Sequence, residues 1–353
     1  MTWPSPPGTA ITEQPLSAGL ATQVQELAAA AARADGVTPL SEDVLLQVRH
    51  GSGAGARDLM LTSGDGVLAG YAHLDAPDEE AQDGDSSGEL VVHPGHRRRG
   101  YGTALSAALL AGGAGVRLWA HGELPAAVGF AKTAGFTRFR ALWQMRMSLS
   151  RVPADDPVAP SGVTIRAFRP GSDEEAWLAV NHRAFAHHPE QGAWAMSDLQ
   201  LREAEPWFDP AGFFLAERDG RLAGFHWTKV HPGGGAGGVP IGEVYVVGVD
   251  PGQQGGGLGR VLTLAGLAHL RRLGLSEVML YVDEDNTAAV RMYTALGFSR
   301  WSTDAMYRHL GGTEPREADL LATGYRRLIP RASSSSLLVS GPSLAATVAR
   351  TSA

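Results

Sequence analysis

The sequence contains no cysteine. Disulfide bonds, zinc sites built from thiolates and a cysteine nucleophile are therefore excluded. The sequence also lacks any run of about 18 apolar residues, the length that a membrane-spanning helix needs. Its first residues, "MTWPSPPGTAITEQP", have neither the basic nor the apolar segment of a secretory signal. We therefore expect a cytoplasmic protein that does not engage a membrane.

Basic charge is scarce, and lysine is nearly absent. The formal net charge is −7, and lysine occurs only at Lys132 and Lys229. Proteins that bind nucleic acid or anionic membranes usually carry a net positive charge. We therefore expect a small-molecule substrate and no nucleic-acid partner. The proportions of hydrophobic (44%) and charged (19%) residues are typical of a globular protein. A length of 353 residues favours two domains, and we expect a monomer.

Two blocks of sequence occur twice in the same order. "VVHPGHRRRGYGTAL" at 91–105 resembles "GVDPGQQGGGLGRVL" at 248–262, with an offset of 157 residues. "AAVGFAKTAGF" at 126–136 resembles "AAVRMYTALGF" at 288–298, with an offset of 162 residues. The chain is therefore predicted to be a tandem duplication of one α/β domain. The predicted parts are domains at 1–150 and 163–312, a linker at 151–162 and a disordered tail at 313–353.

The first block of each repeat places a turn rich in glycine or arginine between an apolar strand and a helix. Successive backbone N–H groups in such a turn, together with the helix N-terminus, form a cradle for an anion. Glycine also lets the main chain approach a ligand closely. Dinucleotide-binding turns are rich in glycine too, but "QGGGLG" lacks their spacing. A P-loop is excluded because the Gly-Lys-Ser/Thr sequence is absent.

The turns at 254–259 and 97–102 are similar to the Q/R-x-x-G-x-G/A signature of the GCN5-related N-acetyltransferase (GNAT) family. A second family-like stretch contains Asn286, Ala289, Tyr293, Gly297 and Phe298. The resemblance covers most of both halves. It implies an α/β fold of two tandem GNAT domains, each a mixed central sheet flanked by helices. Gly255 and Gly256 replace the more usual basic residues, which leaves the diphosphate of the cofactor to backbone amides and the helix terminus.

The resemblance implies that acetyl-CoA is the acetyl donor. In this family the glycine turn holds the diphosphate, and the preceding strand splays from its neighbour to bind the pantetheine arm. The implied contacts in the second half are Val247, Gly248, Val249, Gln254, Gly255, Gly256, Gly257, Leu258, Gly259, Arg260, Asn286, Thr287, Ala288, Ala289, Val290 and Arg291. Those in the first half are Leu90, Val91, Val92, Arg98, Arg99, Gly100, Tyr101, Gly102 and Thr103. The run Arg97–Arg99 is either a phosphate clamp for a second CoA or a solvated surface.

Amide formation from a thioester needs a base for the attacking ammonium, donors for the oxyanion and a hydrogen-bond donor for the leaving thiolate. By resemblance, Glu243 is the base, Tyr293 meets the CoA sulfur, and a backbone N–H of the strand at 247–249 meets the oxyanion. A solvated acid and a core aromatic are the plainer interpretations of the two side chains. The alignment puts Ser86 and Ala131 at the matching positions of the first half. We therefore expect the second half to be catalytic and the first half not to be.

The strings "GEVYVVGVDP", "FAHHPEQGAW", "EPWFDP" and "LYVDEDNTAAVRMY" resemble the mycothiol synthase branch of the family. That branch uses acetyl-CoA to acetylate the cysteinyl amine of a cysteine–glucosamine–inositol pseudodisaccharide, the last step of mycothiol biosynthesis. The resemblance maps the acceptor onto Glu42, Lys229, Glu243 and Tyr281, and we expect the loop at 187–190 to line the acceptor pocket, with His187 as a substrate candidate. Besides Glu243, three of these have plainer interpretations. Lys229 suits a strand-edge surface, Tyr281 suits the alternation of a strand, and Glu42 suits the start of a helix.

Other functions stay open at this point. A tandem acetyltransferase for another small amine fits the same motifs, and so does a CoA-binding module without catalysis. The presence of Glu243 and Tyr293 in only one half argues against the module. His187 and His188 invite a metal site, but adjacent histidines point to different sides of a helix or strand and no ligand cluster accompanies them. We expect no metal.

Overall fold

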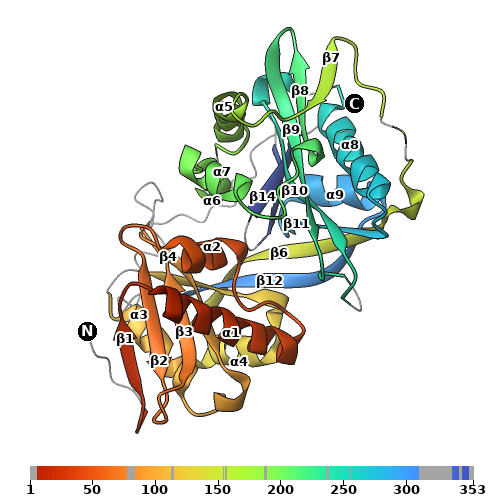
Figure 1. Cartoon of the computed structure of the whole chain (residues 1–353). Coiled ribbons are helices and arrows are strands. Elements are labelled where there is room, and N and C mark those ends of the chain that lie inside the picture. The colour runs from red at the N-terminus through yellow and green to blue at the C-terminus, as the bar shows by residue number, and fades with distance from the viewer. Residues whose placement is uncertain are drawn as a thin grey trace, which may run out of the picture. The chain divides into compact units, whose positions relative to one another are not determined.

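The computed structural model describes residues 6–77, 84–112, 115–153, 155, 157–186, 189–235, 238–254, 256–309, 336–341 and 344–349. The chain divides into two compact units (Figure 1). The N-terminal unit comprises Met1–Ala141 and Thr303–Arg331, and the C-terminal unit comprises Leu142–Ser302 and Ala332–Ala353. Each unit is a mixed sheet flanked by helices, which confirms the predicted fold class.

The N-terminal unit has the strand order β1-β2-β3-β4-β5-β12, in which β4 and β5 are parallel. Alternation along its strands serves two cores, because successive side chains point to opposite faces. Met60 and Tyr71 pack with α1 and α2, whereas Leu59 and Leu61 pack with α3. Its elements up to residue 133 are β1 (Ala10–Glu13), α1 (Ala18–Asp35), α2 (Glu42–His50), β2 (Arg57–Thr62), β3 (Leu68–Leu74), β4 (Ser86–Val92), α3 (Tyr101–Leu110), β5 (Val116–Ala120) and α4 (Pro125–Thr133).

The C-terminal unit has the strand order β6-β11-β10-β9-β8-β7, in which β10 and β11 are parallel. One face packs with α8 and α9 through residues such as Val244 and Leu280. The other face carries an aromatic core around Trp177 and Trp227. Its elements are β7 (Val163–Ala167), α5 (Glu174–Ala184), α6 (Pro189–Gly192), α7 (Met196–Glu203), β8 (Phe213–Arg218), β9 (Arg221–His231), β10 (Ile241–Val249), α8 (Leu258–Arg272), β11 (Glu277–Asp283) and α9 (Thr287–Leu296).

Each unit contains the last strand of the other half of the sequence. β6 (Thr137–Ser148) follows α4, yet from Leu142 onward it belongs to the C-terminal unit, where it pairs with β11. β12 (Ser299–His309) follows α9, yet its pairing with β5, from Ala305 to His309, lies in the N-terminal unit. The compact units therefore differ from the two sequence repeats by an exchange of strands. The division predicted at 151–162 stays a prediction about the repeats.

In both units the two parallel strands separate after a few residues. β10 pairs with β11 at Gly242 and Glu243, and β4 pairs with β5 only from Ser86 to Gly88. The register between β10 and β9 shifts at Tyr245, as in a β-bulge, whereas β4 pairs with β3 without a shift. The extra residue moves the alignment by one position. The structural counterpart of Glu243 is thus Ser87, and the sequence-based choice of Ser86 was wrong.

Near the C-terminus, β13 (Ser336–Gly341) and β14 (Leu344–Ala349) form a separate antiparallel hairpin. This hairpin lies within the predicted tail, beside β11 and β10. The rest of the predicted tail lies outside the described residues.

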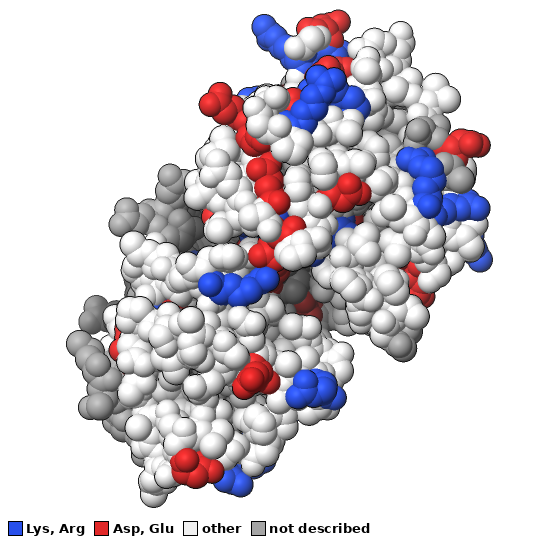
Figure 2. Space-filling view, in the orientation of Figure 1, with Lys and Arg blue, Asp and Glu red and all other residues white. Residues whose placement is uncertain are grey.

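On the face drawn in Figure 2, the described Lys and Arg side chains form small groups with acidic side chains among them. Within the described residues, no helix is both long enough and apolar enough to span a bilayer.

Candidate active site

Glu243 lies at the point where β10 leaves β11, on the face of the sheet opposite to α8 and α9. Only 4% of the residue is exposed. Its Oε2 lies 2.6 Å from Nε2 of His231, whose side chain is 29% exposed. The structure therefore buries the predicted base and links it to solvent through a histidine that the sequence analysis did not identify.

Lys229 faces Glu243 directly across the β9–β10 pairing. It is 6% exposed, which does not fit the surface-lysine interpretation. Its Nζ lies 4.1 Å from the ring centroid of Trp207 and 4.9 Å from that of Tyr245. Such contacts stabilise a desolvated ammonium. The β-bulge places Tyr245 there, and its hydroxyl accepts a hydrogen bond of 3.2 Å from Nε of Arg202. A cation and a carboxylate thus lie side by side on one face of the sheet.

Tyr281 lies on β11, on the same face of the sheet as Glu243. Its hydroxyl accepts a hydrogen bond of 2.7 Å from Nε2 of Gln144. Gln144 comes from β6, a strand of the first half of the sequence. The predicted acceptor residues Lys229, Glu243 and Tyr281 are therefore brought to one face of the C-terminal sheet.

Tyr293 is fully buried on α9, with its ring against Phe298 at a centroid distance of 5.6 Å. Its hydroxyl has no hydrogen-bond partner among the described residues. Burial raises the pKa of this hydroxyl well above its usual value, so the group stays protonated and has a proton to donate to a hydrogen bond. A buried hydroxyl without a partner is costly and suits a ligand atom that arrives from outside the chain.

The glycine turn before α8 has the conformation that an anion cradle needs. Gly256 and Gly257 have φ of +76° and +81°, values that favour glycine, and α8 begins at Leu258. The first backbone N–H groups of a helix have no partner within the helix, so those of α8 can bind an anion. A Cβ at Gly257 would meet no described atom within 4 Å, which shows open space beside the turn. The predicted contact Gly255 lies outside the described residues.

The predicted cofactor contacts at the start of α9 differ in how accessible they are to a ligand. Asn286 caps the helix, accepting a hydrogen bond of 3.1 Å from the N–H of Ala289. Ala289 is completely buried in the core, so its side chain is not available to a ligand. Thr287 and Arg291 are exposed at the start of the helix.

Comparison of the sequence with known proteins shows the family to which the chain belongs. Residues 177–298 match the profile described as "Acetyltransferase (GNAT) family", and residues 57–138 match that of the "Acetyltransferase (GNAT) domain". The chain is 62% identical over 286 residues to the mycothiol acetyltransferase of Thermobispora bispora, an alignment that covers 81% of this chain and 94% of that protein. It is 54% identical over 308 residues to the mycothiol acetyltransferase of Streptomyces avermitilis, with coverages of 87% and 97%. The chain belongs to the mycothiol acetyltransferase family. It is therefore an acetyltransferase, and the resemblance to GNAT proteins is confirmed.

Solved structures agree with this assignment of the fold. A tandem GNAT protein from the clavulanic acid biosynthesis pathway has a TM-score of 0.63 at 21% identity, covering 86% of this chain and 99% of that chain. A GCN5-related N-acetyltransferase from Sphaerobacter thermophilus has a TM-score of 0.59 at 25% identity, with coverages of 86% and 98%. The fold of this chain is thus shared by more distant proteins, one of which is described as a tandem GNAT protein.

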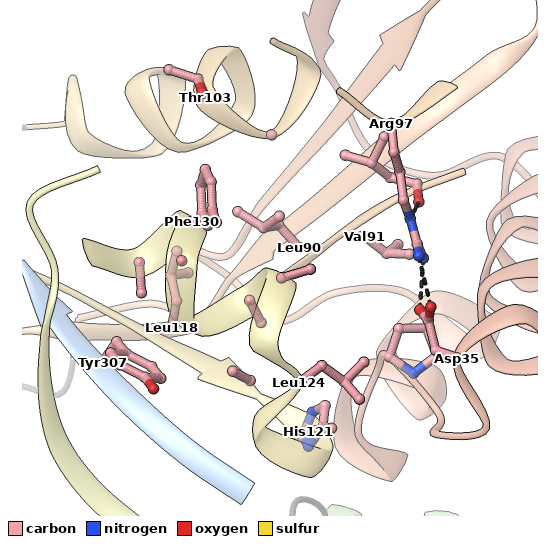
Figure 3. A pocket seen from close by; sticks show the side chains of 18 of the residues that line it. Asp35, Leu90, Val91, Arg97, Thr103, Leu118, His121, Leu124, Phe130 and Tyr307 are labelled. Carbon is pink, nitrogen blue, oxygen red and sulfur yellow. Dashed lines mark hydrogen bonds and ion pairs between the residues drawn. The ribbon is translucent and has the colours of Figure 1, made fainter. Parts of the chain in front are cut away.

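In this member of the mycothiol acetyltransferase family, the N-terminal unit has a cavity of about 710 Å³ between its own separating strands (Figure 3). The cavity wall includes most of the predicted first-half contacts, namely Leu90, Val91, Val92, Arg98, Gly100, Tyr101, Gly102 and Thr103. Arg97 is held by Asp35 through two hydrogen bonds of 2.6 Å each, so its guanidinium is already neutralised. Arg98 thus lines the cavity as a cation without such a carboxylate partner among the described residues.

His121 lines the same cavity and belongs to a buried cluster of charges. Its Nε2 lies 3.1 Å from Oε1 of Glu89, and its Nδ1 lies 3.3 Å from Oδ2 of Asp304. The backbone N–H of Ser41 donates to Glu89 at 2.6 Å, and that of Gly122 donates to Asp304 at 2.7 Å. Burial by itself lowers the pKa of His121, but the two carboxylates raise it to about 10. The imidazolium therefore ties β12, through Asp304, to β4 and β5.

This charge state predicts a pH-dependent stability. The pKa of His121 is raised from 6.5 to about 10 on folding, so its stabilisation is complete below pH 6.5 and is lost as the pH rises through 10. We expect His121→Gln to lower the free energy of unfolding by about 3–5 kcal/mol at pH 6, the cost of breaking a buried ion pair. Urea unfolding at pH 6, 8 and 10 should show that the difference in the free energy of unfolding between wild type and His121→Gln becomes smaller at each higher pH. A difference that is constant over this range would mean that the ring is uncharged.

Some predicted site residues are not assembled with the others by the described structure. His187 lies outside the described residues. Glu42 is the first residue of α2 in the N-terminal unit, where Ser41 caps the helix by accepting from the N–H of Val44 at 3.3 Å. Within the described residues, no group of three or more His, Cys, Asp or Glu side chains is placed to hold a metal ion. Residues that the sequence analysis missed are His231 and Gln144, because each acts through a partner that no sequence spacing indicates.

Proposed function

We propose that this chain transfers the acetyl group of acetyl-CoA to the cysteinyl amine of a cysteine–glucosamine–inositol pseudodisaccharide, the last step of mycothiol biosynthesis. The observation that carries the proposal is the buried carboxylate of Glu243, beside Lys229, where β10 leaves β11. Relatives that are 52–62% identical bear the name mycothiol acetyltransferase, which supports this acceptor.

The residues around the C-terminal glycine turn suit acetyl-CoA as the donor, whose thioester supplies an activated acetyl group. The amides at 256–259 and the N-terminus of α8 would hold its diphosphate. The hydroxyl of Tyr293 has no other partner among the described residues and would meet its sulfur. Because β13 and β14 lie beside β11 and β10, the donor and this hairpin would compete for the opening between the strands.

Glu243 would take the proton that the acceptor ammonium must lose before it can attack. Its Oε2 is engaged by His231, and its Oε1 has no hydrogen-bond partner among the described residues. Oε1 is therefore the atom that can accept the proton, directly or through a water. His231 is partly exposed and offers that proton a route to solvent.

The amine nitrogen then bonds to the thioester carbonyl carbon, and the bond from that carbon to sulfur breaks. The second proton that the nitrogen loses as it becomes an amide ends on the leaving sulfur, which departs as the CoA thiol. Negative charge on the carbonyl oxygen would be stabilised by a backbone N–H of the strand at 247–249, on the side that β11 has left. Negative charge on the leaving sulfur would be met by the O–H of Tyr293, which burial keeps protonated. No step in this scheme uses a metal.

The N-terminal unit would bind acetyl-CoA in its cavity without turning it over. Its counterpart of Glu243 is Ser87, and its counterpart of Tyr293 is Ala131. The second equivalence rests on matching hydrogen bonds of 2.9 Å, from Phe136 N to Ala131 O and from Phe298 N to Tyr293 O. Neither a base nor a sulfur partner is therefore present at these positions. We propose further that the chain acts as a monomer in the cytoplasm.

A turnover assay with a matched pair of glycine variants tests this function. Wild type should acetylate the cysteinyl acceptor and prefer it to an amine of similar size without a thiol. Gly257 and Gly100 precede α8 and α3 with φ of +81° and +82°, so alanine strains both turns equally, by about 1–3 kcal/mol. We expect Gly257→Ala to raise KM for acetyl-CoA about tenfold, and Gly100→Ala to leave turnover within twofold. Loss of turnover in Gly100→Ala alone would place the chemistry in the other unit.

A further inference from the structure

A row of side chains crosses the C-terminal sheet at the level of Glu243. Lys229 pairs with Glu243, Glu243 pairs with Met279, and Met279 pairs with Arg146 of β6. Paired residues of neighbouring strands point to the same face of a sheet. The neighbours Val244, Val278 and Met147 pack into the core on the other face, which confirms the alternation. Arg146 therefore points to the same face as the predicted base, two strands away, or roughly 10 Å between backbones.

Arg146 is part of a hydrogen-bonded chain that ends at a predicted acceptor residue. Its Nε donates to Oε1 of Gln144 at 2.8 Å, and Nε2 of Gln144 donates to the hydroxyl of Tyr281 at 2.7 Å. This chain fixes the orientation of the guanidinium. Within the described residues, the two terminal amino groups of Arg146 have no hydrogen-bond acceptor. They are therefore oriented donors that are free to bind a ligand.

Trp301 of β12 completes this end of the row. The guanidinium carbon of Arg146 lies 4.5 Å from the centroid of its ring. The residue is nevertheless 60% exposed, an unusual exposure for a tryptophan. An exposed indole beside an oriented arginine suits a polyhydroxylated ring, because the C–H groups of such a ring pack on the indole while its hydroxyls accept hydrogen bonds from the guanidinium.

We propose that Arg146 and Trp301 bind the inositol end of the acceptor and set the specificity of the enzyme for it. The inference rests on the proposed function. An amine held at Glu243 is separated from the inositol by an amide and one sugar ring, on the order of 10 Å. That separation matches the distance from Glu243 to Arg146 across two strands. A strand from the first half of the sequence thus supplies acceptor contacts to the second.

The test compares two acceptors, the complete pseudodisaccharide and cysteinylglucosamine, which lacks the inositol. We expect Arg146→Met, which keeps the contact with Trp301 but removes the donors, to raise KM for the complete acceptor about 10- to 100-fold. KM for cysteinylglucosamine and KM for acetyl-CoA should change less than twofold. Trp301→Leu, at an exposed position, should act in the same direction and does not depend on the folding of the first variant. Arg300→Met is the matched control, since Arg300 stacks on Trp143 at 4.8 Å, and it should behave as wild type.

The remaining outcomes each overturn the inference. Equal changes with both acceptors would show a general disturbance of the site, and unchanged kinetics with both would show that Arg146 does not contact the acceptor. If wild type acetylates neither acceptor, the proposed function itself fails, and the inference fails with it. That result is distinguishable because it appears before any variant is made.

Discussion

Replacing Glu243 by glutamine is expected to lower kcat about 10²- to 10⁴-fold, the usual contribution of a positioned general base. The substitution keeps the size and the hydrogen-bonding capacity of the side chain but removes the site that accepts the ammonium proton. KM for acetyl-CoA should stay within about twofold, because the donor is held elsewhere. The acetylated product should be quantified by mass spectrometry, since the acceptor carries a thiol that would interfere with detection of free CoA.

The pH profile gives this variant a signature that a structural defect would not produce. Without a base, only the acceptor that is already deprotonated reacts, so kcat/KM should rise about tenfold per pH unit up to the pKa of the acceptor amine. Glu203→Gln is the control, because Glu203 is another carboxyl of this unit, at the end of α7, whose pKa burial, with Glu174 nearby, raises to about 7. Its kinetics should match wild type. A Glu243→Gln enzyme that retained a third of its turnover would contradict the assignment.

Replacing Tyr293 by phenylalanine is expected to lower kcat about 10- to 100-fold and, at the same time, to stabilise the fold. The hydroxyl is buried without a partner among the described residues, so its removal relieves a desolvation cost of about 1 kcal/mol. The same removal deprives the leaving sulfur of its hydrogen-bond donor. Urea unfolding and steady-state kinetics on one preparation measure both effects.

The opposite signs make this prediction specific. If Tyr293 only fills the core, Tyr293→Phe should have normal turnover. If its hydroxyl supports the fold, Tyr293→Phe should be less stable than wild type. Phe298→Leu is a suitable control, since Phe298 packs on the ring of Tyr293 without a polar group. It should lower stability through lost packing, by about 1 kcal/mol, and change turnover little.

The sequence was sufficient to predict the repeat, the glycine turns and the fold class, because each depends on residues close together in the chain. It could not predict the exchange of β6 and β12, because strand partners are selected by tertiary packing and neither strand carries a local signal for its partner. The bulge at Tyr245 had the same effect on a smaller scale. An alignment counted along the chain misses one extra residue, and it selected Ser86 where the structure places Ser87.

The side chains missed by sequence analysis share one property, which is that their role depends on a partner brought by folding. His231 reaches Glu243 across a hairpin. His121 joins Glu89 and Asp304, which are 215 residues apart in the sequence. Lys229 was noticed for its rarity, yet its burial depends on Trp207, which lies between α7 and β8, and on Tyr245 at the bulge of β10.

The most direct test is the structure of the chain with acetyl-CoA bound. The account predicts the diphosphate on the backbone amides at 256–259 and the thioester sulfur within about 3.5 Å of the Tyr293 hydroxyl, with Glu243 facing the side from which the amine attacks. The account would be contradicted if acetyl-CoA were bound only at the turn of the N-terminal unit, or if its sulfur lay away from Tyr293 in the C-terminal unit.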